Sequence, residues 1–501
     1  MVFENPVIKQ LVEKTRILWA LGHAQSLMGW DTETNMPPEG AMERGIAAGE
    51  ISVLQQKILL SPEIVGLVDK ADKIEDLNDY ERGVVRVLKR HIRIAKALPP
   101  RLIYEFARTS EEAKVVWRQA REKDDFNMFK PYLEKLVKLG REAAEYLGYV
   151  EHPYDALLDL HEEGLLTRDV DRIFSVLEPG IRKVLDKIIS EELFSKEHEL
   201  EKIKYDRNSM EKVNIEILKI FGFPLGRRAR LDVSTHPFTT GIGVRDVRIT
   251  TRYEGIDFKR TMYSVIHEFG HALYHLQIDE RLIATPLAGG ASLGIHESQS
   301  RFWENIIGRS MSFTEAIYPV LTKYLDFIKK YSPEDIYYYF NTVRPGFIRV
   351  DADEVTYNFH ILLRFKLEKL LIAGEIKVEE LPELWNNEFE RLLGLRPRTY
   401  KEGVLQDIHW SMGQVGYFPT YTIGNIVSAQ IRHYIMKDIP DFYEKIRNND
   451  YKEIKEYLRE KIHKWGSTFA PKDLLKRSFG EEMNPKYFID YLLEKYIYKK
   501  I

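Results

Sequence analysis

The stretch Thr261-Met-Tyr-Ser-Val-Ile-His-Glu-Phe-Gly-His271 decides how the rest of the sequence is interpreted. It contains the pattern His-Glu-x-x-His at His267, Glu268 and His271, and apolar residues at helical spacing surround it. Residues four apart lie on one helical face, about 6 Å apart along the axis. Both imidazoles can therefore bind one metal ion, and Glu268 beside them is placed to take a proton from a water there.

A catalytic zinc site of this kind also needs a third protein ligand and an open fourth position. His275 continues the same helical face, but it lies about 12 Å from His267 along a straight helix, too far to share one ion. A longer motif would need Gly at 274 and His at 277, and the chain has Tyr274 and Gln277 instead. The third ligand must therefore come from another segment.

The segment Gly294-Ile-His-Glu-Ser-Gln-Ser-Arg-Phe-Trp-Glu304 follows a Gly-rich turn and has the pattern of a helix start. We predict that Glu297, near its beginning, is the third ligand. Glu304, two turns later, is predicted to be an outer partner of a ligand or a salt bridge. His296 is next to the ligand and is expected to face elsewhere and to pack.

Outside the motif, helical periodicity dominates, for example in residues 129–147, 170–189 and 451–465. The β region is residues 230–253, and we expect its part at 244–250 to pair with the substrate backbone as an added strand. The sequence predicts a mainly α protein, a large helical body with a small β-sheet next to the motif helix.

Composition excludes several classes of protein and partner. Among 501 residues, 74 Lys plus Arg against 77 Asp plus Glu give a net charge of -3, so no basic field indicates nucleic acid. There is no cysteine, which excludes disulfides, thiolate zinc sites and cysteine nucleophiles. The longest uncharged stretch, 408–431, is a poor membrane span and is expected to be buried or to line the site. We expect a cytoplasmic protein without membrane or nucleic-acid partners.

Beyond the metal motif, the chain resembles the carboxypeptidase Taq family of metallocarboxypeptidases. The family's motifs occur in order as His236-Pro-Phe238, Asp246-Val-Arg-Ile-Thr250, His267-Glu-Phe-Gly-His271, His296-Glu-Ser-Gln299, Ile348-Arg-Val-Asp-Ala-Asp353 and Gly403-Val-Leu-Gln-Asp-Ile-His-Trp410. Trp30-Asp-Thr-Glu-Thr-Asn-Met-Pro37 also resembles the opening of the family. The resemblance covers almost the whole chain.

The resemblance implies a thermostable, mainly helical, saddle-shaped homodimer. Each subunit would be a single domain over residues 1–501, with residues 1–200 forming one side of a deep groove and 201–501 forming the catalytic part. One metal ion would lie at the groove floor, usually Zn²⁺, which Co²⁺ can replace. The implied activity is release of C-terminal amino acids from peptides with broad specificity, C-terminal proline being disfavoured.

The negative oxygen that develops during peptide hydrolysis needs a hydrogen-bond donor beside the metal. His409 and Tyr421 are our candidates, because both lie in the uncharged stretch and His409 belongs to a family motif. Tyr417 competes for the tyrosine role and is otherwise expected to bind substrate in the groove.

A carboxypeptidase must also recognise the terminal carboxylate of its substrate, and the planar fork of an arginine suits that task. Arg349 is the leading candidate; its alternative is an internal ion pair with Asp351 or Asp353. Arg248 is second, with an alternative role in holding the sheet edge. His236 is expected either to touch the substrate or to brace the neighbouring strand.

Two other functions fit the same residues. A metallo-oligopeptidase that cuts internally would share this metal geometry, and it would accept a peptide with a blocked C-terminus. A peptide-binding scaffold with an inert metal site would have no use for Glu268 as a base.

Overall fold

A computed structural model describes residues 2–498 of the protein. These residues form two compact units, and each unit combines three segments of the chain. Unit 1 comprises residues 2–96, 198–340 and 428–482, and unit 2 comprises residues 97–197, 341–427 and 483–498. The division between residues 427 and 428 falls inside helix α16 (Pro419–Asp438).

Unit 1 holds twelve of the α-helices found in residues 2–498 and all three of their strands. The helices are α1 (Pro6–Thr34), α2 (Ala41–Leu59), α3 (Pro62–Ala71), α4 (Asp79–Ala97), α9 (Arg207–Ile220), α10 (Lys259–Gln277), α11 (Leu293–Arg301), α12 (Met311–Tyr324), α13 (Pro333–Phe340), α17 (Phe442–Arg447), α18 (Lys452–Lys461) and α19 (Pro471–Phe479). Polar caps begin several of them. Asn5 accepts a hydrogen bond from the Val7 amide at the start of α1, for example, which satisfies a free N–H of the first turn.

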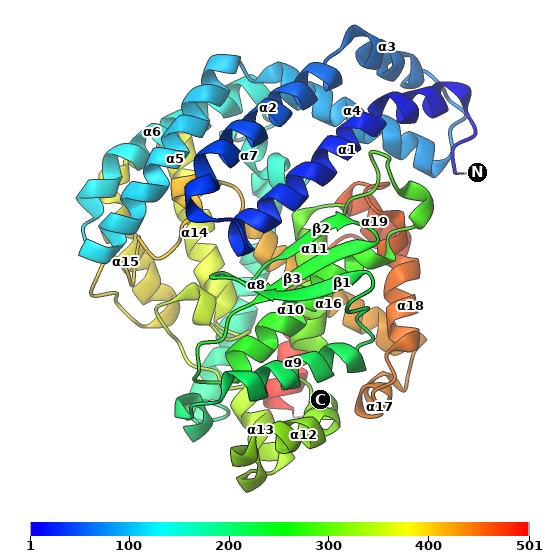
Figure 1. The fold of residues 1–501 in the computed structure, drawn as a ribbon. Coiled ribbons are helices and arrows are strands. Elements are labelled where there is room, and N and C mark those ends of the chain that lie inside the picture. Colours follow the sequence, from blue (N-terminus) through cyan, green and yellow to red (C-terminus); the bar gives the residue numbers. More distant parts are fainter. Residues whose placement is uncertain (1, 499–501) are drawn as a thin grey trace. The chain divides into compact units, whose positions relative to one another are not determined.

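The strands β1 (Ala229–Val233), β2 (Thr239–Gly243) and β3 (Asp246–Thr251) form one mixed sheet in the order β1-β3-β2. β1 runs parallel to β3 and β2 runs antiparallel to it. The sheet lies against the motif helix α10 (Figure 1), as the sequence predicted. The expectation that residues 244–250 accept a substrate strand is wrong, because β3 is the central strand and both of its edges are already paired.

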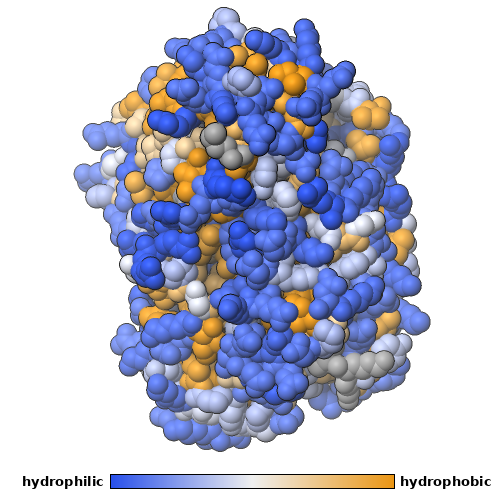
Figure 2. All heavy atoms as spheres, turned by 90° about the vertical axis from the view of Figure 1, so that its right-hand side faces the viewer, coloured by the Kyte–Doolittle hydropathy of each residue, from blue (hydrophilic) through white to orange (hydrophobic). Residues whose placement is uncertain are grey.

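Two apolar clusters support unit 1. One joins α1, α3 and α4 through fully buried residues such as Leu11 and Val84. The other lies beneath α10, where the Phe269 ring contacts Phe221 and Trp303 at centroid distances of 4.9 and 4.7 Å. Hydrophilic side chains cover most of the molecular face that Figure 2 presents, with hydrophobic ones in smaller groups.

Among its described residues, unit 2 contains helices joined by turns and loops, and no strand. It contains α5 (Pro100–Lys123), α6 (Phe126–Leu147), α7 (Pro153–His161), α8 (Thr167–Ser190), α14 (Tyr357–Ala373), α15 (Leu381–Leu393) and α20 (Lys486–Leu492). α14 is its central helix, because buried residues occur all round its circumference and it contacts α6, α7, α8 and α15. The predicted mainly α architecture with a small sheet is therefore confirmed, and α6, α8 and α18 match three of the expected helices.

Among residues 2–498, no single helix has the length and apolar character needed to cross a membrane. One bent pair, Pro38–Leu59 with Pro62–Ala71, meets the length and composition criteria together.

Candidate metal centre

The metal centre is built where helices α10 and α11 cross. α10 buries one face through residues such as Val265, Ile266 and Phe269, which leaves His267 and His271 together on another face. The helices meet at Gly270: a Cβ there would lie 2.5 Å from the Gln299 carbonyl oxygen, which is backbone of α11. A glycine inside the motif is therefore needed for the close crossing that brings α11 to the two histidines.

The three predicted ligands lie together at this crossing. Glu297 Oε2 is 3.6 Å from His267 Nε2 and 3.4 Å from His271 Nε2. All three ligand atoms lie within 4.8 Å of one another. In a tetrahedral site with bonds of about 2.0–2.1 Å, ligand atoms are about 3.3 Å apart, and two imidazoles with one carboxylate are a common catalytic zinc set. The donor atoms and their spacing therefore fit a divalent metal ion.

An arginine and a second carboxylate hold this trio. Arg301 Nε donates to Glu297 Oε1 at 2.7 Å, so the other carboxylate oxygen of Glu297 faces the histidines. Glu304, in the π-helical segment Phe302–Ile307 (η4), has its Oε2 2.8 Å from His267 Nδ1 and 3.2 Å from Arg301 Nη1. Glu304 is thus the outer partner of a predicted ligand, as expected.

Charge distribution in the centre favours ionised carboxylates. Burial alone would raise the pKa of Glu297, but Arg301 and the two histidines hold that pKa well below its usual range. Burial alone would lower the pKa of His267, yet the charges of Glu297 and Glu304 outweigh it and raise that pKa. Both carboxylates therefore stay anionic, as a cation site requires.

Glu268, the predicted base, is buried and points toward strand β2. Its Oε2 lies 2.6 Å from the Thr239 hydroxyl oxygen, which also lies 3.0 Å from the Glu268 carbonyl. Thr239 is the first residue of β2. The sequence analysis did not identify Thr239, since nothing in the spacing of β2 indicates that its hydroxyl meets the motif glutamate.

The expectation that His296 faces away from the ligands is wrong. Its Nδ1 lies 2.6 Å from His271 Nδ1, and its Nε2 lies 3.0 Å from His275 Nε2. Burial lowers the pKa of His296 and that of His275, the latter to about 4. A signal was present in the sequence, because His275 follows His271 by four residues and therefore shares its helical face.

Two further predicted residues lie on or beside the sheet of unit 1. The Arg248 guanidinium pairs with Asp246 through bonds of 3.0 and 2.8 Å and lies 4.4 Å from the Trp30 ring. His236 lies in the exposed connection between β1 and β2, where its carbonyl accepts from the Ser234 hydroxyl. Arg248 thus forms its ion pair within β3, the central strand, rather than at an edge of the sheet.

Arg349 belongs to unit 2, where its side chain is 6% exposed. Its Nε and Nη2 donate to Asp407 Oδ1 at 3.0 and 2.8 Å, and its Nη1 donates to the Tyr357 hydroxyl at 2.9 Å. The carboxylate partner is thus Asp407, and the expected alternative pairing with Asp351 or Asp353 is wrong. Three of the five guanidinium N–H groups are used in these bonds.

His409 and Tyr421 contact each other in unit 2, with His409 Nε2 3.1 Å from the Tyr421 hydroxyl. Tyr417 joins them through ring contacts at centroid distances of 5.4 Å to each. Burial, reinforced by the positive charge of Arg349, lowers the pKa of His409 to about 3. His409 is therefore neutral near pH 7, which suits a hydrogen-bond donor that carries no charge.

A buried carboxylate of α14, Glu368, anchors the segment that carries His409. It accepts hydrogen bonds from the Tyr154 hydroxyl at 2.6 Å, the Trp410 indole at 2.7 Å and the Gly416 amide at 3.0 Å. Burial raises its pKa to about 7 despite these three donors. The sequence analysis missed Glu368, because a single glutamate in a helical pattern usually indicates a solvated surface.

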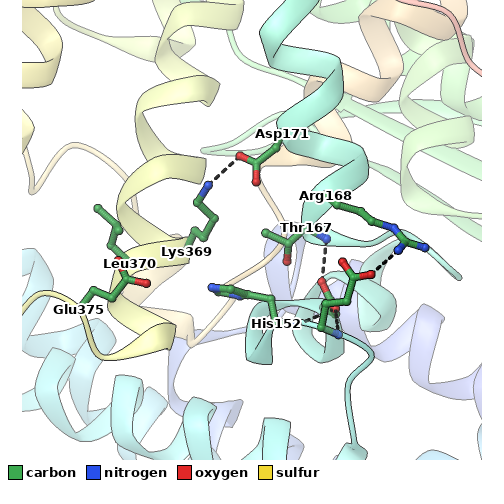
Figure 3. Close-up of a pocket in the computed structure, with 9 residues that line it drawn as sticks. His152, Thr167, Arg168, Asp171, Lys369, Leu370 and Glu375 are labelled. Atoms are coloured by element: carbon green, nitrogen blue, oxygen red, sulfur yellow. Dashed lines mark hydrogen bonds and ion pairs between the residues drawn. The ribbon is translucent and has the colours of Figure 1, made fainter.

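A polar cavity of about 440 Å³ in unit 2 contains none of the predicted site residues (Figure 3). Four of its charged side chains form two ion pairs, Lys369 with Asp171 at 2.7 Å and Arg168 with Glu151. Asp155 accepts from the Thr167 amide at 2.7 Å and so caps α8. Its polar groups thus serve local structure.

The crossing of α10 and α11 defines the class of protein, a metal-dependent peptidase with a His/His/Glu site. The family model described as carboxypeptidase Taq (M32) metallopeptidase matches residues 10–496, and the chain belongs to this family of peptide hydrolases. It is 62% identical over 496 residues to thermostable carboxypeptidase 1 of Pyrococcus furiosus, covering 99% of each chain. It is 37% identical over 475 residues to carboxypeptidase 1 of Bacillus subtilis, covering 94% of each.

A solved structure of the Pyrococcus furiosus carboxypeptidase is similar in fold to this chain. The TM-score is 0.98 at 62% identity, over 99% of this chain and all of that one. A solved Trypanosoma cruzi metallocarboxypeptidase 1 has a TM-score of 0.92 at 33% identity, over 98% and 99%.

Proposed function

We propose that this metallocarboxypeptidase uses one zinc ion per subunit, held by His267, His271 and Glu297, to release C-terminal amino acids from peptides. The observation that carries the proposal is the spacing of the two imidazole nitrogens around Glu297 Oε2, 3.6 and 3.4 Å. A zinc ion held by these residues would supply Lewis acidity and make an attacking water easier to deprotonate, and cobalt would substitute for it. We further propose broad specificity, with C-terminal proline disfavoured.

Glu268 is proposed as the general base and acid. Its carboxylate accepts one proton from the attacking water on one oxygen and returns that proton to the leaving amine nitrogen. The Thr239 hydroxyl at Oε2 supports this role, because it restricts rotation of the carboxylate without neutralising its charge.

His409 and Tyr421 are proposed to donate hydrogen bonds to the oxygen that becomes negative in the transition state. Their mutual contact at 3.1 Å supports joint action, since one group can orient the other. Tyr417 contacts both rings and is proposed to line the peptide-binding surface.

Arg349 is proposed to bind the terminal carboxylate, with Arg248 as second candidate and His236 as a further substrate contact. Asp407 and Tyr357 fix the Arg349 fork, and one N–H on each terminal nitrogen remains beyond the three bonds described. A preordered arginine loses less side-chain entropy on binding a carboxylate.

Of the remaining features, the cytoplasmic location is inferred from composition, and the others follow from the family resemblance alone. We propose a cytoplasmic homodimer of saddle-shaped subunits, in which residues 1–501 act as one domain around a deep peptide-binding groove. Size-exclusion chromatography with light scattering tests the oligomeric state directly.

The deciding experiment digests one peptide with a free C-terminus and its C-terminally amidated copy, with products resolved by mass. We expect stepwise loss of C-terminal residues from the free peptide, loss of activity with a chelator and recovery with zinc. Internal cleavage of both peptides at equal rates would instead support an oligopeptidase. Glu297→Ala should abolish zinc binding by elemental analysis, and a normal zinc content would exclude Glu297 as a ligand.

The same peptide pair tests the arginines. Arg349→Ala should lower kcat/KM for the free peptide more than any residual rate on the amidated one, while Arg248→Ala serves as the matched comparison. Equal losses on both peptides for Arg349→Ala, with a selective loss for Arg248→Ala, would assign the carboxylate to Arg248.

A further inference from the structure

The two histidine ligands differ in what lies behind them. His267 Nδ1 meets a carboxylate, Glu304 Oε2, at 2.8 Å. His271 Nδ1 meets another imidazole, His296 Nδ1, at 2.6 Å. An outer carboxylate on a metal-bound histidine is common, whereas an outer imidazole must itself have the correct tautomer to accept the hydrogen bond.

The contacts behind His271 continue to a third imidazole. His296 Nε2 lies 3.0 Å from His275 Nε2, and the ring centroids in this row are 4.8 and 4.7 Å apart. His271 and His275 come from α10, and His296 comes from α11. The row therefore joins the two helices whose crossing forms the metal site.

Hydrogen-bond chemistry gives the row one direction. Nε2 of His271 faces Glu297 and must be bare to bind a metal, so Nδ1 of His271 carries the hydrogen and donates. Nδ1 of His296 then accepts, which places the hydrogen of that ring on Nε2. Nε2 of His275 accepts in turn, which leaves its hydrogen on Nδ1. One bound ion thus determines the tautomers of three rings.

Two glycines provide the space that the outer rings occupy. A Cβ on Gly241 of β2 would lie 2.5 Å from His275 Nδ1, and a Cβ on Gly290 would lie 2.9 Å from His296 Cδ2. The Tyr274 ring contacts His296 at a centroid distance of 4.9 Å. Neighbouring segments therefore confine both imidazoles, and the contact with His271 is a fixed part of the fold.

We propose that His296 and His275 are positioning residues, which hold His271 in the tautomer and orientation that bind the metal. This inference rests on the metal-binding part of the proposed function, and neither residue is assigned a contact with the ion or the substrate. Loss of an outer partner of this kind typically weakens metal binding about 10- to 100-fold.

The test compares substitutions that remove the acceptor with substitutions that retain one. His296→Phe keeps a ring but cannot accept, whereas His296→Asn offers an oxygen near the position of Nδ1. His275→Phe and His275→Gln form the second pair, because the glutamine oxygen reaches the position of Nε2. His433→Phe is the control, since His433 lies in unit 1 with its ring against Tyr434.

The readouts are zinc affinity by chelator competition and the absorption spectrum of the cobalt-loaded protein, neither of which depends on turnover. We expect His296→Phe to weaken zinc binding about 10- to 100-fold and to change the cobalt spectrum. His275→Phe should have a smaller effect in the same direction, the Asn and Gln variants should recover most of each loss, and His433→Phe should match the wild type.

Wild-type zinc affinity and an unchanged cobalt spectrum in His296→Phe would overturn the proposal. If that variant fails to fold, the His275 pair decides, and equal affinity for His275→Phe, His275→Gln and wild type overturns it. Glu297→Ala distinguishes failure of the proposed metal site from failure of the positioning role. If Glu297→Ala retains zinc, the proposed metal site is wrong. If Glu297→Ala loses zinc while the His296 and His275 variants bind it normally, only the positioning role of these two histidines is wrong.

Discussion

Helices α10 and α14 are comparable buried helices in units 1 and 2, and each carries a polar pair four residues apart. On α14 the pair is Arg364 and Glu368, both fully buried, and on α10 it is His267 and His271. Arg364 pairs with Asp407 at 2.5 Å, and Glu368 accepts three hydrogen bonds. The α14 pair is therefore bonded directly to protein groups.

On α10 the inner nitrogens of the pair are not bonded in this way. Both Nε2 atoms stand 3.4–3.6 Å from Glu297 Oε2, farther than a normal hydrogen bond and suited to an ion between them. The same helical spacing thus gives an internal brace on one helix and a metal site on the other. The distance from each side chain to its protein partner, rather than the spacing along the helix, distinguishes the structural pair on α14 from the metal-binding pair on α10.

The largest effect is expected from substitution of Glu268, the acidic residue beside the histidine pair of α10. Glu268→Gln keeps the size and the contact with Thr239 but removes the proton acceptor, so we expect kcat to fall about 10²- to 10⁴-fold. Zinc content by elemental analysis should stay normal, because no predicted ligand changes. Glu280→Gln on the exposed surface is the control, and wild-type turnover in Glu268→Gln would exclude it as the base.

Substitutions in the ion pairs that Asp407 forms with Arg364 of α14 and with Arg349 should lower the stability of the protein rather than its affinity for metal. Asp407→Asn leaves the buried Arg349 and Arg364 without their counter-charge, which should cost about 3–5 kcal/mol. Thermal unfolding of the metal-free proteins measures this loss. The exposed pair of Asp326 with Lys329 offers Asp326→Asn as the control, which should change stability by less than about 0.5 kcal/mol. Equal changes in unfolding temperature for Asp407→Asn and Asp326→Asn would contradict a stabilising role for the Asp407 ion pairs.

Glu368 should make stability depend on pH. Its pKa is raised from 4.5 to about 7, so the folded state holds a proton that the unfolded state has already released in this window. Its stabilising contribution is complete below pH 4.5 and is lost as the pH rises to 7, by about 3 kcal/mol. Unfolding temperatures of wild type and Glu368→Gln across this range measure it. The variant should lack this decline, and parallel curves would contradict the assignment.

The smallest effect is expected at the crossing itself. Gly270→Ala places a methyl 2.5 Å from the Gln299 carbonyl and 2.6 Å from Ser300 Cα, so α10 and α11 must separate, at about 1–3 kcal/mol. Zinc affinity should fall too, because Glu297 moves with α11. Gly45→Ala on α2 is the matched control, since nothing lies within 4 Å of its added Cβ. Unchanged zinc affinity in Gly270→Ala would show that the crossing tolerates displacement.

Local patterns predicted much of the fold and the centre of the site. The motif gave both histidines because the four-residue period of a helix is a local property, and Glu297 was found because a turn and a helix start mark its segment. The alternative role considered for Arg349 was an ion pair with Asp351 or Asp353, close neighbours in sequence, whereas its actual partner Asp407 lies 58 residues away. The pairing of β3 was missed because sheet order depends on segments that only folding brings together.

The sequence by itself determined the metal-binding pair, the helical class and the resemblance to a peptidase family, since each follows from residue types at short, regular intervals. The tertiary structure alone decided that Thr239 meets Glu268, that His296 stands behind His271 and that Glu368 is anchored by three donors. Those contacts arise where separate helices and strands cross, and their geometry depends on the packing of residues far apart in the chain.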